Sequence, residues 1–199
     1  MSQDPSLKPD IILASSSPFR KSLLERLHLD FISISPDINE DRLEAEQASD
    51  YVCRLARQKA QVIAAQYPQS IVIGSDQCAL LDGNILGKPG SHENALAQLK
   101  NAQGKTAVFH TGLCVLQQSN NFCEVEDVLF EVQFRELNDE QLEHYLEVEQ
   151  PYTCAGSFKS EAYGICLFEE MRGNDPTALV GLPLIRLTKM LESAGVSVI

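Results

Sequence analysis

A run of serines followed by two cations is the first feature that could carry chemistry. Serines begin at Ser15, directly after a short apolar segment, and Pro18 is followed closely by Arg20 and Lys21. The N-terminus of a helix favours an anion, and an arginine can hold phosphate oxygens through two hydrogen bonds. The segment therefore predicts a phosphate site, although a serine-capped helix with surface cations is the alternative. The glycine-rich motif GxxxxGK[ST] is absent.

A single acid interrupts the most apolar stretch of the chain, residues 70–81. This acid is Asp76. A carboxylate inside an apolar strand is costly unless it is paired or bound to a metal. Such carboxylates often act as general bases or as metal ligands. The alternative is a structural acid that is held by backbone groups or by a nearby lysine.

Two lysines occupy positions that suit ligand binding. Lys88 lies in the short loop Gly87-Lys88-Pro89, and Lys59 falls on the apolar stripe of a predicted helix. A lysine on such a stripe either extends to solvent or points into a cleft. The loop of residues 155–164 mixes glycine, serine, charged and aromatic residues, which is typical of a recognition loop.

These residues need a scaffold of alternating strands and helices. Apolar and alternating segments predict strands at residues 10–14, 31–35, 70–81, 105–117, 122–134 and 164–170. Helical periodicity and capping residues predict helices at residues 19–27, 48–66, 91–102, 138–147 and 183–194. A turn at residues 119–121 makes the two longest strands a hairpin. We therefore expect an α/β fold with a mixed sheet.

Composition excludes several classes of protein. The 199 residues carry a net charge of −12, which repels nucleic acids and anionic lipids, so we expect neither as a partner. No leader peptide and no membrane-spanning apolar run is visible. The six cysteines form no CxxC pair, which favours reduced thiols and a cytoplasmic location. We expect a frayed N-terminus at residues 1–10 and one domain at residues 11–199.

Taken together, the ordered motifs resemble the Maf-like nucleotide pyrophosphatases. The matching segments are residues 13–20 (LASSSPFR), 54–60 (RLARQKA), 74–77 (GSDQ), 87–89 (GKP), 111–112 (TG), 154–161 (CAGSFKSE) and 180–184 (VGLPL). The resemblance covers nearly the whole chain. The ordered set is specific, whereas any one of the motifs alone would not be.

The resemblance implies an elongated α/β domain of the Maf-like and ITPase-like type, with a mixed curved sheet, two lobes and a central cleft. It implies hydrolysis of a nucleoside triphosphate to the monophosphate and pyrophosphate with a divalent metal, Mg²⁺ or Mn²⁺. Homodimers are common in the family, which leaves a homodimer open here. Within the family, Phe19, the pair Asp76-Gln77 and Glu161 resemble the 7-methyl-GTP pyrophosphatase subgroup. The subgroup typically carries tryptophan in place of Phe19, so the cation–π contact with a cationic base is expected to be weaker.

The resemblance also implies roles for individual residues. The proton acceptor falls on Asp76, and Glu40 would help Asp76 to hold the metal. Four positions match residues that grip the triphosphate: Ser15, Arg20, Lys59 and Lys88. Three positions match those that select the base: Phe19, Gln77 and Glu161.

Two other functions remain as alternatives. The first is a pyrophosphatase for dTTP and UTP, but the arginine, threonine and glutamine expected at its specificity positions are missing. The second is a mainly regulatory protein, since family members have been linked to septum formation. The full set of cations and carboxylates argues against that second function.

Overall fold

The computed structural model describes residues 10–199, so the predicted frayed segment lies, apart from Asp10, outside the described residues. The strands are β1 (Ile11–Ala14), β2 (Ile32–Ile34), β3 (Ile71–Leu81), β4 (Asn84–Leu86), β5 (Thr106–Gln117), β6 (Phe122–Phe134) and β7 (Phe168–Gly173). The helices are α1 (Pro18–Glu25), α2 (Ala48–Ala64), α3 (His92–Ala102), α4 (Asp139–Glu149) and α5 (Leu184–Ser193). Within the described residues, no helix is long and apolar enough to cross a membrane.

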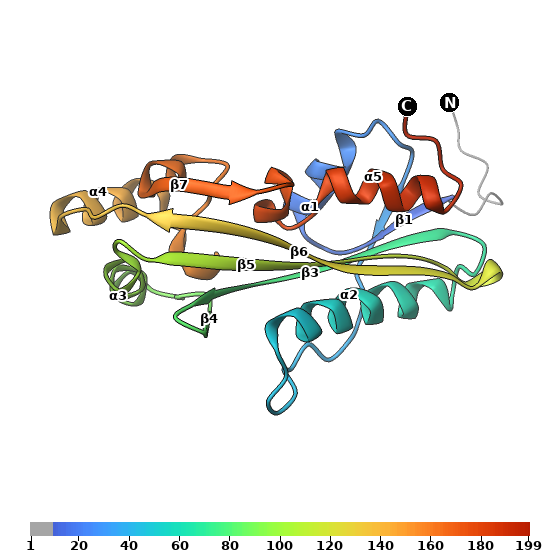
Figure 1. Ribbon diagram of the computed structural model, residues 1–199, viewed down its shortest axis with the longest axis horizontal. Helices are drawn as coiled ribbons and strands as arrows, with labels where there is room; N and C mark the ends of the chain where they lie inside the picture. The colour runs from blue at the N-terminus through green and yellow to red at the C-terminus, as the bar shows by residue number, and fades with distance from the viewer. Residues whose placement is uncertain (1–9) are drawn as a thin grey trace.

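Within residues 10–199 the strands form one mixed sheet in the order β2-β1-β3-β5-β6-β7, and β4 pairs with β3. Strand β1 runs parallel to β2 and β3, and the pairs from β3 onward are antiparallel. The long strands β3, β5 and β6 extend along most of the length of the molecule (Figure 1). This architecture confirms the predicted mixed α/β fold, including the hairpin of β5 and β6.

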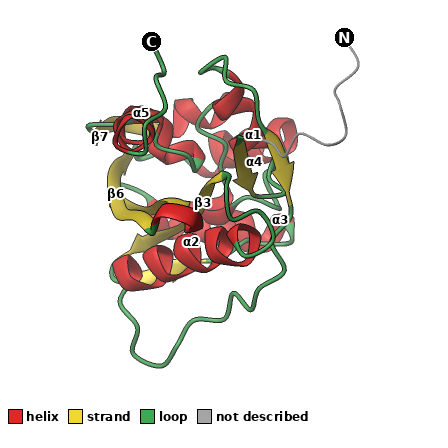
Figure 2. Cartoon of the chain, turned by 90° about the vertical axis from the view of Figure 1, so that its right-hand side faces the viewer, coloured by secondary structure: helices red, strands yellow, loops and turns green. Residues whose placement is uncertain are grey.

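The two ends of the sheet carry separate hydrophobic cores, which gives the molecule its two lobes. In the first lobe, α1 and α5 pack on one face of the sheet and α2 packs on the other (Figures 1 and 2). In the second lobe, α3, α4 and β7 surround a core rich in aromatic residues, including Phe109, Phe134 and Phe158. The elongated shape expected from the resemblance is confirmed (Figure 1).

Two glycines let α2 lie unusually close to the sheet. A Cβ atom at Gly74 would lie 2.1 Å from the carbonyl oxygen of Ala56, and one at Gly112 would lie 2.2 Å from that of Val52. Real side chains do not tolerate such distances, so only glycine fits at both sites. The close packing brings the buried face of α2, including Lys59, directly over β3.

The predicted strand at residues 164–170 is wrong over its first half. The chain instead forms a 3₁₀ turn at Tyr163–Leu167, and the strand β7 begins at Phe168. A Cβ atom at Gly164 would lie 2.4 Å from the carbonyl oxygen of Lys159, so this segment is folded tightly on the preceding loop. The short strand β4 and the 3₁₀ turn at Pro176–Val180 were not predicted, since each is too short for periodicity to show.

Candidate active site

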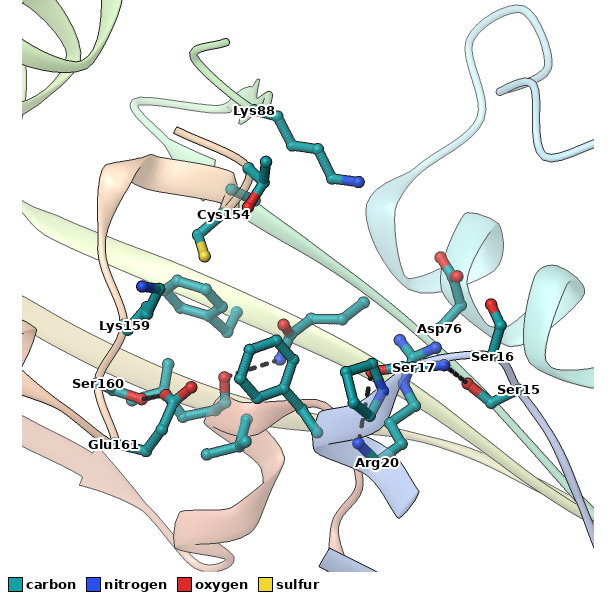
Figure 3. A pocket seen from close by; sticks show the side chains of 18 of the residues that line it. Ser15, Ser16, Ser17, Arg20, Asp76, Lys88, Cys154, Lys159, Ser160 and Glu161 are labelled. Atoms are coloured by element: carbon teal, nitrogen blue, oxygen red, sulfur yellow. Dashed lines mark hydrogen bonds between the residues drawn. The ribbon is translucent and has the colours of Figure 1, made fainter. Parts of the chain in front are cut away.

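A cavity of about 590 Å³ opens between the two lobes, and its walls include every residue to which the family resemblance gave a role. These residues are Ser15, Phe19, Arg20, Glu40, Lys59, Asp76, Gln77, Lys88 and Glu161. Ser15, Ser16, Ser17, Arg20 and Asp76 gather at one end, here called the serine end (Figure 3). Residues 159–161 lie at the opposite end, here called the loop end (Figure 3).

The serine end is built by the start of α1. Ser17 caps the helix by accepting a hydrogen bond from the backbone N–H of Arg20 at 3.4 Å, and Pro18 occupies the first turn. The side chain of Ser15 is buried and accepts a bond from the backbone N–H of Ser17 at 3.1 Å. The helix start is therefore serine-capped, and its residues line the cavity.

Arg20 is fixed by a carbonyl group from a distant segment. Its Nε donates to the carbonyl oxygen of Gly181 at 2.9 Å, and the hydroxyl of Ser75 donates to the same oxygen at 2.9 Å. Gly181 has a φ of 109°, a conformation that favours glycine. Burial lowers the pKa of Arg20, while the charges of Asp76 and Glu40 act in the opposite direction. The carbonyl oxygen of Gly181 therefore sets the position of the guanidinium group.

The buried lysine of α2 joins two carboxylates. Lys59 Nζ lies 2.6 Å from Asp76 Oδ1 and 2.7 Å from Glu40 Oε1. Lys59 and Asp76 are both buried, whereas the side chain of Glu40 is 56% exposed. The hydroxyl of Tyr51 donates to the carbonyl oxygen of Glu40 at 3.0 Å, which fixes the Glu40 loop against α2. The sequence left open whether Lys59 extends to solvent or points into a cleft. In the structure its side chain points into the cleft.

The carboxylate oxygens at the serine end suit a hard cation whose remaining ligands come from a bound molecule. Within residues 10–199, no three His, Cys, Asp or Glu side chains are placed to hold a metal by themselves. Glu40 and Asp76 nevertheless meet at one ammonium group. Magnesium in nucleotide sites commonly uses one or two carboxylates and completes its shell with phosphate and water oxygens. The residues present therefore fit such a cation only together with ligand oxygens.

Gln77 serves mainly to hold the wall of the cavity. Its Nε2 donates to Thr111 Oγ1 at 3.1 Å and to the carbonyl oxygens of Ala178 and Leu179 at 2.7 and 3.2 Å. Since the amide nitrogen is used within the protein, Oε1 is the atom that Gln77 can offer to a ligand. Gln77 faces the 3₁₀ turn Pro176–Val180, whereas its neighbour Asp76 faces α2, as alternation along a strand requires.

An aromatic ring and an acid also line the cavity. Phe19 is 44% exposed where α1 begins, and Glu161 is exposed on the loop across the cavity. The hydroxyl of Ser160 donates to Glu161 Oε2 at 3.3 Å. Lys159 Nζ lies 2.8 Å from Glu149 Oε1, a contact that raises the pKa of Lys159. Lys88 reaches over the upper edge of the cavity toward the serine end (Figure 3).

Sequence analysis did not assign a role to Tyr51 or Lys159, although both line the cavity. Tyr51 lies eight residues before Lys59 on α2, so helical spacing places the two side chains on one face and could have identified it. Lys159 lies inside the recognised motif at residues 154–161. Its bond to Glu149 joins residues that no local pattern connects.

Comparisons with known proteins identify the family of this chain. The family model described as Maf-like protein matches residues 10–194. A protein of Nitrosococcus oceani named 7-methyl-GTP pyrophosphatase is 52% identical over 96% of each chain. A Pseudomonas aeruginosa protein with the same name is 52% identical over 96% of this chain and 99% of its own. Among solved structures, the Ham1 protein of Staphylococcus aureus aligns with a TM-score of 0.45 and 15% identity, over 63% of this chain and 72% of that one. The chain belongs to the Maf-like protein family.

Proposed function

We propose that this protein is a nucleotide pyrophosphatase that hydrolyses 7-methyl-GTP to 7-methyl-GMP and pyrophosphate. The observation that carries the proposal is one cavity with a buried carboxylate among cations at one end and an exposed ring and acid along its length. Relatives that are 52% identical over nearly the whole chain are named 7-methyl-GTP pyrophosphatases, which supports the substrate. The reaction is hydrolysis of an acid anhydride.

The cations would bind the triphosphate. Arg20 is held in place through Nε, so its terminal nitrogens can meet phosphate oxygens. Lys88 reaches the cavity from the opposite lobe, and the hydroxyl of Ser15 faces the same space. Such a local cluster offsets the repulsion between an anionic nucleotide and a protein of net charge −12.

Asp76 would act as the general base. A water molecule attacks the α-phosphorus, its proton passes to the carboxylate of Asp76, and pyrophosphate leaves. Lys59 keeps this carboxylate in one position through the 2.6 Å contact. The same ammonium group can stabilise negative charge on the phosphates as it develops.

Glu40 and Asp76 would hold Mg²⁺ or Mn²⁺ together with phosphate oxygens. When bound, the cation would neutralise charge on the leaving pyrophosphate. Tyr51 would support this role by fixing the backbone of Glu40.

Specificity would come from the ring of Phe19 and the charge of Glu161. Methylation at N7 makes guanine cationic, so a ring face contributes a cation–π contact of about 0.5–2 kcal/mol. The carboxylate of Glu161 can accept hydrogen bonds from the N1–H and the amino group of guanine. Its negative charge favours the methylated base further.

The test is pyrophosphate release from 7-methyl-GTP, GTP, dTTP, UTP and CTP with Mg²⁺ or Mn²⁺. We expect 7-methyl-GTP to have the highest kcat/KM. Asp76→Asn, which keeps the shape of the side chain, should abolish turnover while nucleotide binding persists. Preference for dTTP or UTP would contradict the proposed specificity, and no release from any nucleotide would contradict the proposed activity.

The proposal also concerns location and oligomeric state. We expect the protein to act in the cytoplasm, and the free state of all six cysteines supports a reducing compartment. The resemblance leaves a homodimer open, and sedimentation of the purified protein would decide between a monomer and a dimer.

A further inference from the structure

Two loops from distant parts of the sequence meet at the wall of the cavity. The first, residues 87–90, carries Lys88, and the second, residues 155–161, carries Glu161. The backbone N–H of Gly156 donates to the carbonyl oxygen of Gly87 at 3.4 Å. Lys88, proposed to bind phosphate, and Glu161, proposed to select the base, therefore lie on two loops that contact each other.

One side chain of α3 connects these loops through both ends of its amide group. Gln98 Nε2 donates to the carbonyl oxygen of Gly87 at 3.1 Å. Gln98 Oε1 accepts a bond from the hydroxyl of Ser157 at 2.6 Å. A carbonyl oxygen can only accept, so Nε2 must face Gly87 and Oε1 must face Ser157. These two hydrogen bonds are called the Gln98 bridge below.

The backbone of Ser157 supports a role for this bridge. Ser157 is fully buried and has a φ of 64°, a left-handed conformation that a residue other than glycine adopts only when its surroundings hold it there. The hydroxyl of Tyr145 donates to its carbonyl oxygen at 3.4 Å. The strained residue lies two positions before Lys159 and four before Glu161, so its conformation sets the path of the chain into the cavity wall.

We propose that Gln98 is a positioning residue that fixes the Lys88 loop and the Glu161 loop relative to each other, so that phosphate binding and base selection depend on the same bridge. This inference rests on the proposed function for the roles of Lys88 and Glu161. Gln98 itself does not line the cavity. It acts only through Gly87 and Ser157.

The test compares Gln98→Met with a matched control at the residue that directly follows the same helix. Methionine keeps the length and helix propensity of glutamine but makes neither hydrogen bond. The control is Gln103→Met, because Gln103 also uses both ends of its amide group. Its Nε2 donates to the carbonyl oxygen of Leu137, and its Oε1 accepts a bond from the backbone N–H of Leu137. Those bonds tie α3 to the chain before α4 and not to the cavity loops.

Two readouts separate positioning from simple loss of folding. For Gln98→Met we expect kcat/KM on 7-methyl-GTP to fall about tenfold, with a smaller fall on UTP. A variant that only unfolds more would lose both activities by one factor and keep their ratio. Hydrogen exchange should become about tenfold faster in residues 84–90 and in residues 154–164 together, because each segment loses one bond of the bridge. Gln103→Met should change neither the ratio nor this exchange.

A second variant guards against misfolding. Ser157→Gly removes the hydroxyl but suits the left-handed backbone, so the protein should fold and still show the reduced substrate ratio. An unchanged ratio, or faster exchange in only one of the two segments, would overturn the proposal. If the wild-type protein releases pyrophosphate from neither nucleotide, the proposed function fails, and the exchange measurement still decides whether Gln98 couples the loops.

Discussion

Lys59 Nζ lies 2.6 Å from Asp76 Oδ1, and the two buried side chains come from α2 and β3. The same nitrogen lies 2.7 Å from Glu40 Oε1, so one lysine holds two acids at the serine end of the cavity. Without this cation, the two carboxylates would repel each other and the phosphates of a nucleotide. The pair therefore combines a structural role with the proposed catalytic one.

Lys59→Met tests both roles. We expect turnover to fall at least about a hundredfold, because a charge that stabilises the reacting phosphates is lost. We also expect the free energy of unfolding to fall by about 3 kcal/mol, since Asp76 remains buried without its partner. Pyrophosphate release and urea unfolding measure the two effects.

The double variant Lys59→Met with Asp76→Asn is the control for the stability effect. It removes the uncompensated charge, so most of the lost stability should return while turnover remains absent. If Lys59→Met alone were as stable as the wild type, the pair would not bear on folding.

The individual parts of this site could be predicted from sequence more readily than their connections. The serine-capped helix start and the acid in an apolar strand are local patterns, and the structure contains both. The bond of Lys59 to Glu40 could not be predicted, because Glu40 lies on an irregular loop that periodicity does not describe. The same limit applies to Gly181, whose carbonyl oxygen fixes Arg20 from 161 positions away.

Gly74→Ala tests the close packing that puts Lys59 over β3. The added Cβ atom would lie 2.1 Å from a backbone oxygen of α2, which no side-chain rotation can relieve. We expect a loss of about 3 kcal/mol in unfolding free energy. Activity per folded molecule should fall as well, because α2 must move away from Asp76.

The control for Gly74→Ala is Gly87→Ala, where an added Cβ atom would meet nothing within 4 Å. Its unfolding free energy should match that of the wild type. Equal stability of the two variants would show that α2 can shift at little cost.

The fold was predictable where an element is long and its pattern is repeated. The hairpin of β5 and β6 is present as predicted, and the helix predicted at residues 138–147 begins with a capping box of Asn138 and Gln141. The segment around Gly164 was mispredicted, because its apolar residues serve a tight 3₁₀ turn against Lys159. Tertiary packing determines the conformation of that segment, and the periodicity of the local sequence does not indicate it.

Phe19→Trp tests the cation–π contribution to base selection. Phe19 is 44% exposed at the cavity, so a larger ring can be accommodated there. Tryptophan is the stronger partner for a cation, and we expect the preference for 7-methyl-GTP over GTP to rise about threefold. Phe19→Leu, which keeps an apolar side chain without a ring, should lower that preference by a similar factor. Equal ratios in all three proteins would contradict a role for the ring.

The ion pair of Glu46 and Arg54 makes the stability of the Glu40 loop depend on pH. Glu46 accepts two hydrogen bonds from Arg54, at 2.6 and 2.8 Å, and these bonds lower the pKa of Glu46 from 4.5 to about 2. A carboxyl group whose pKa is lower in the folded state stabilises the protein above its unfolded pKa. That contribution is therefore complete at neutral pH and is lost as the pH falls from about 4.5 toward 2.

Urea unfolding of the wild type and Glu46→Gln between pH 7 and pH 2.5 measures this effect. We expect the variant to be less stable by about 1 kcal/mol at pH 7, with the difference shrinking as the pH falls below 4.5. Glu44→Gln removes a charge from the same loop and serves as the control for the overall change in net charge. A constant difference between wild type and Glu46→Gln across this range would mean that the carboxylate of Glu46 is not stabilised by Arg54.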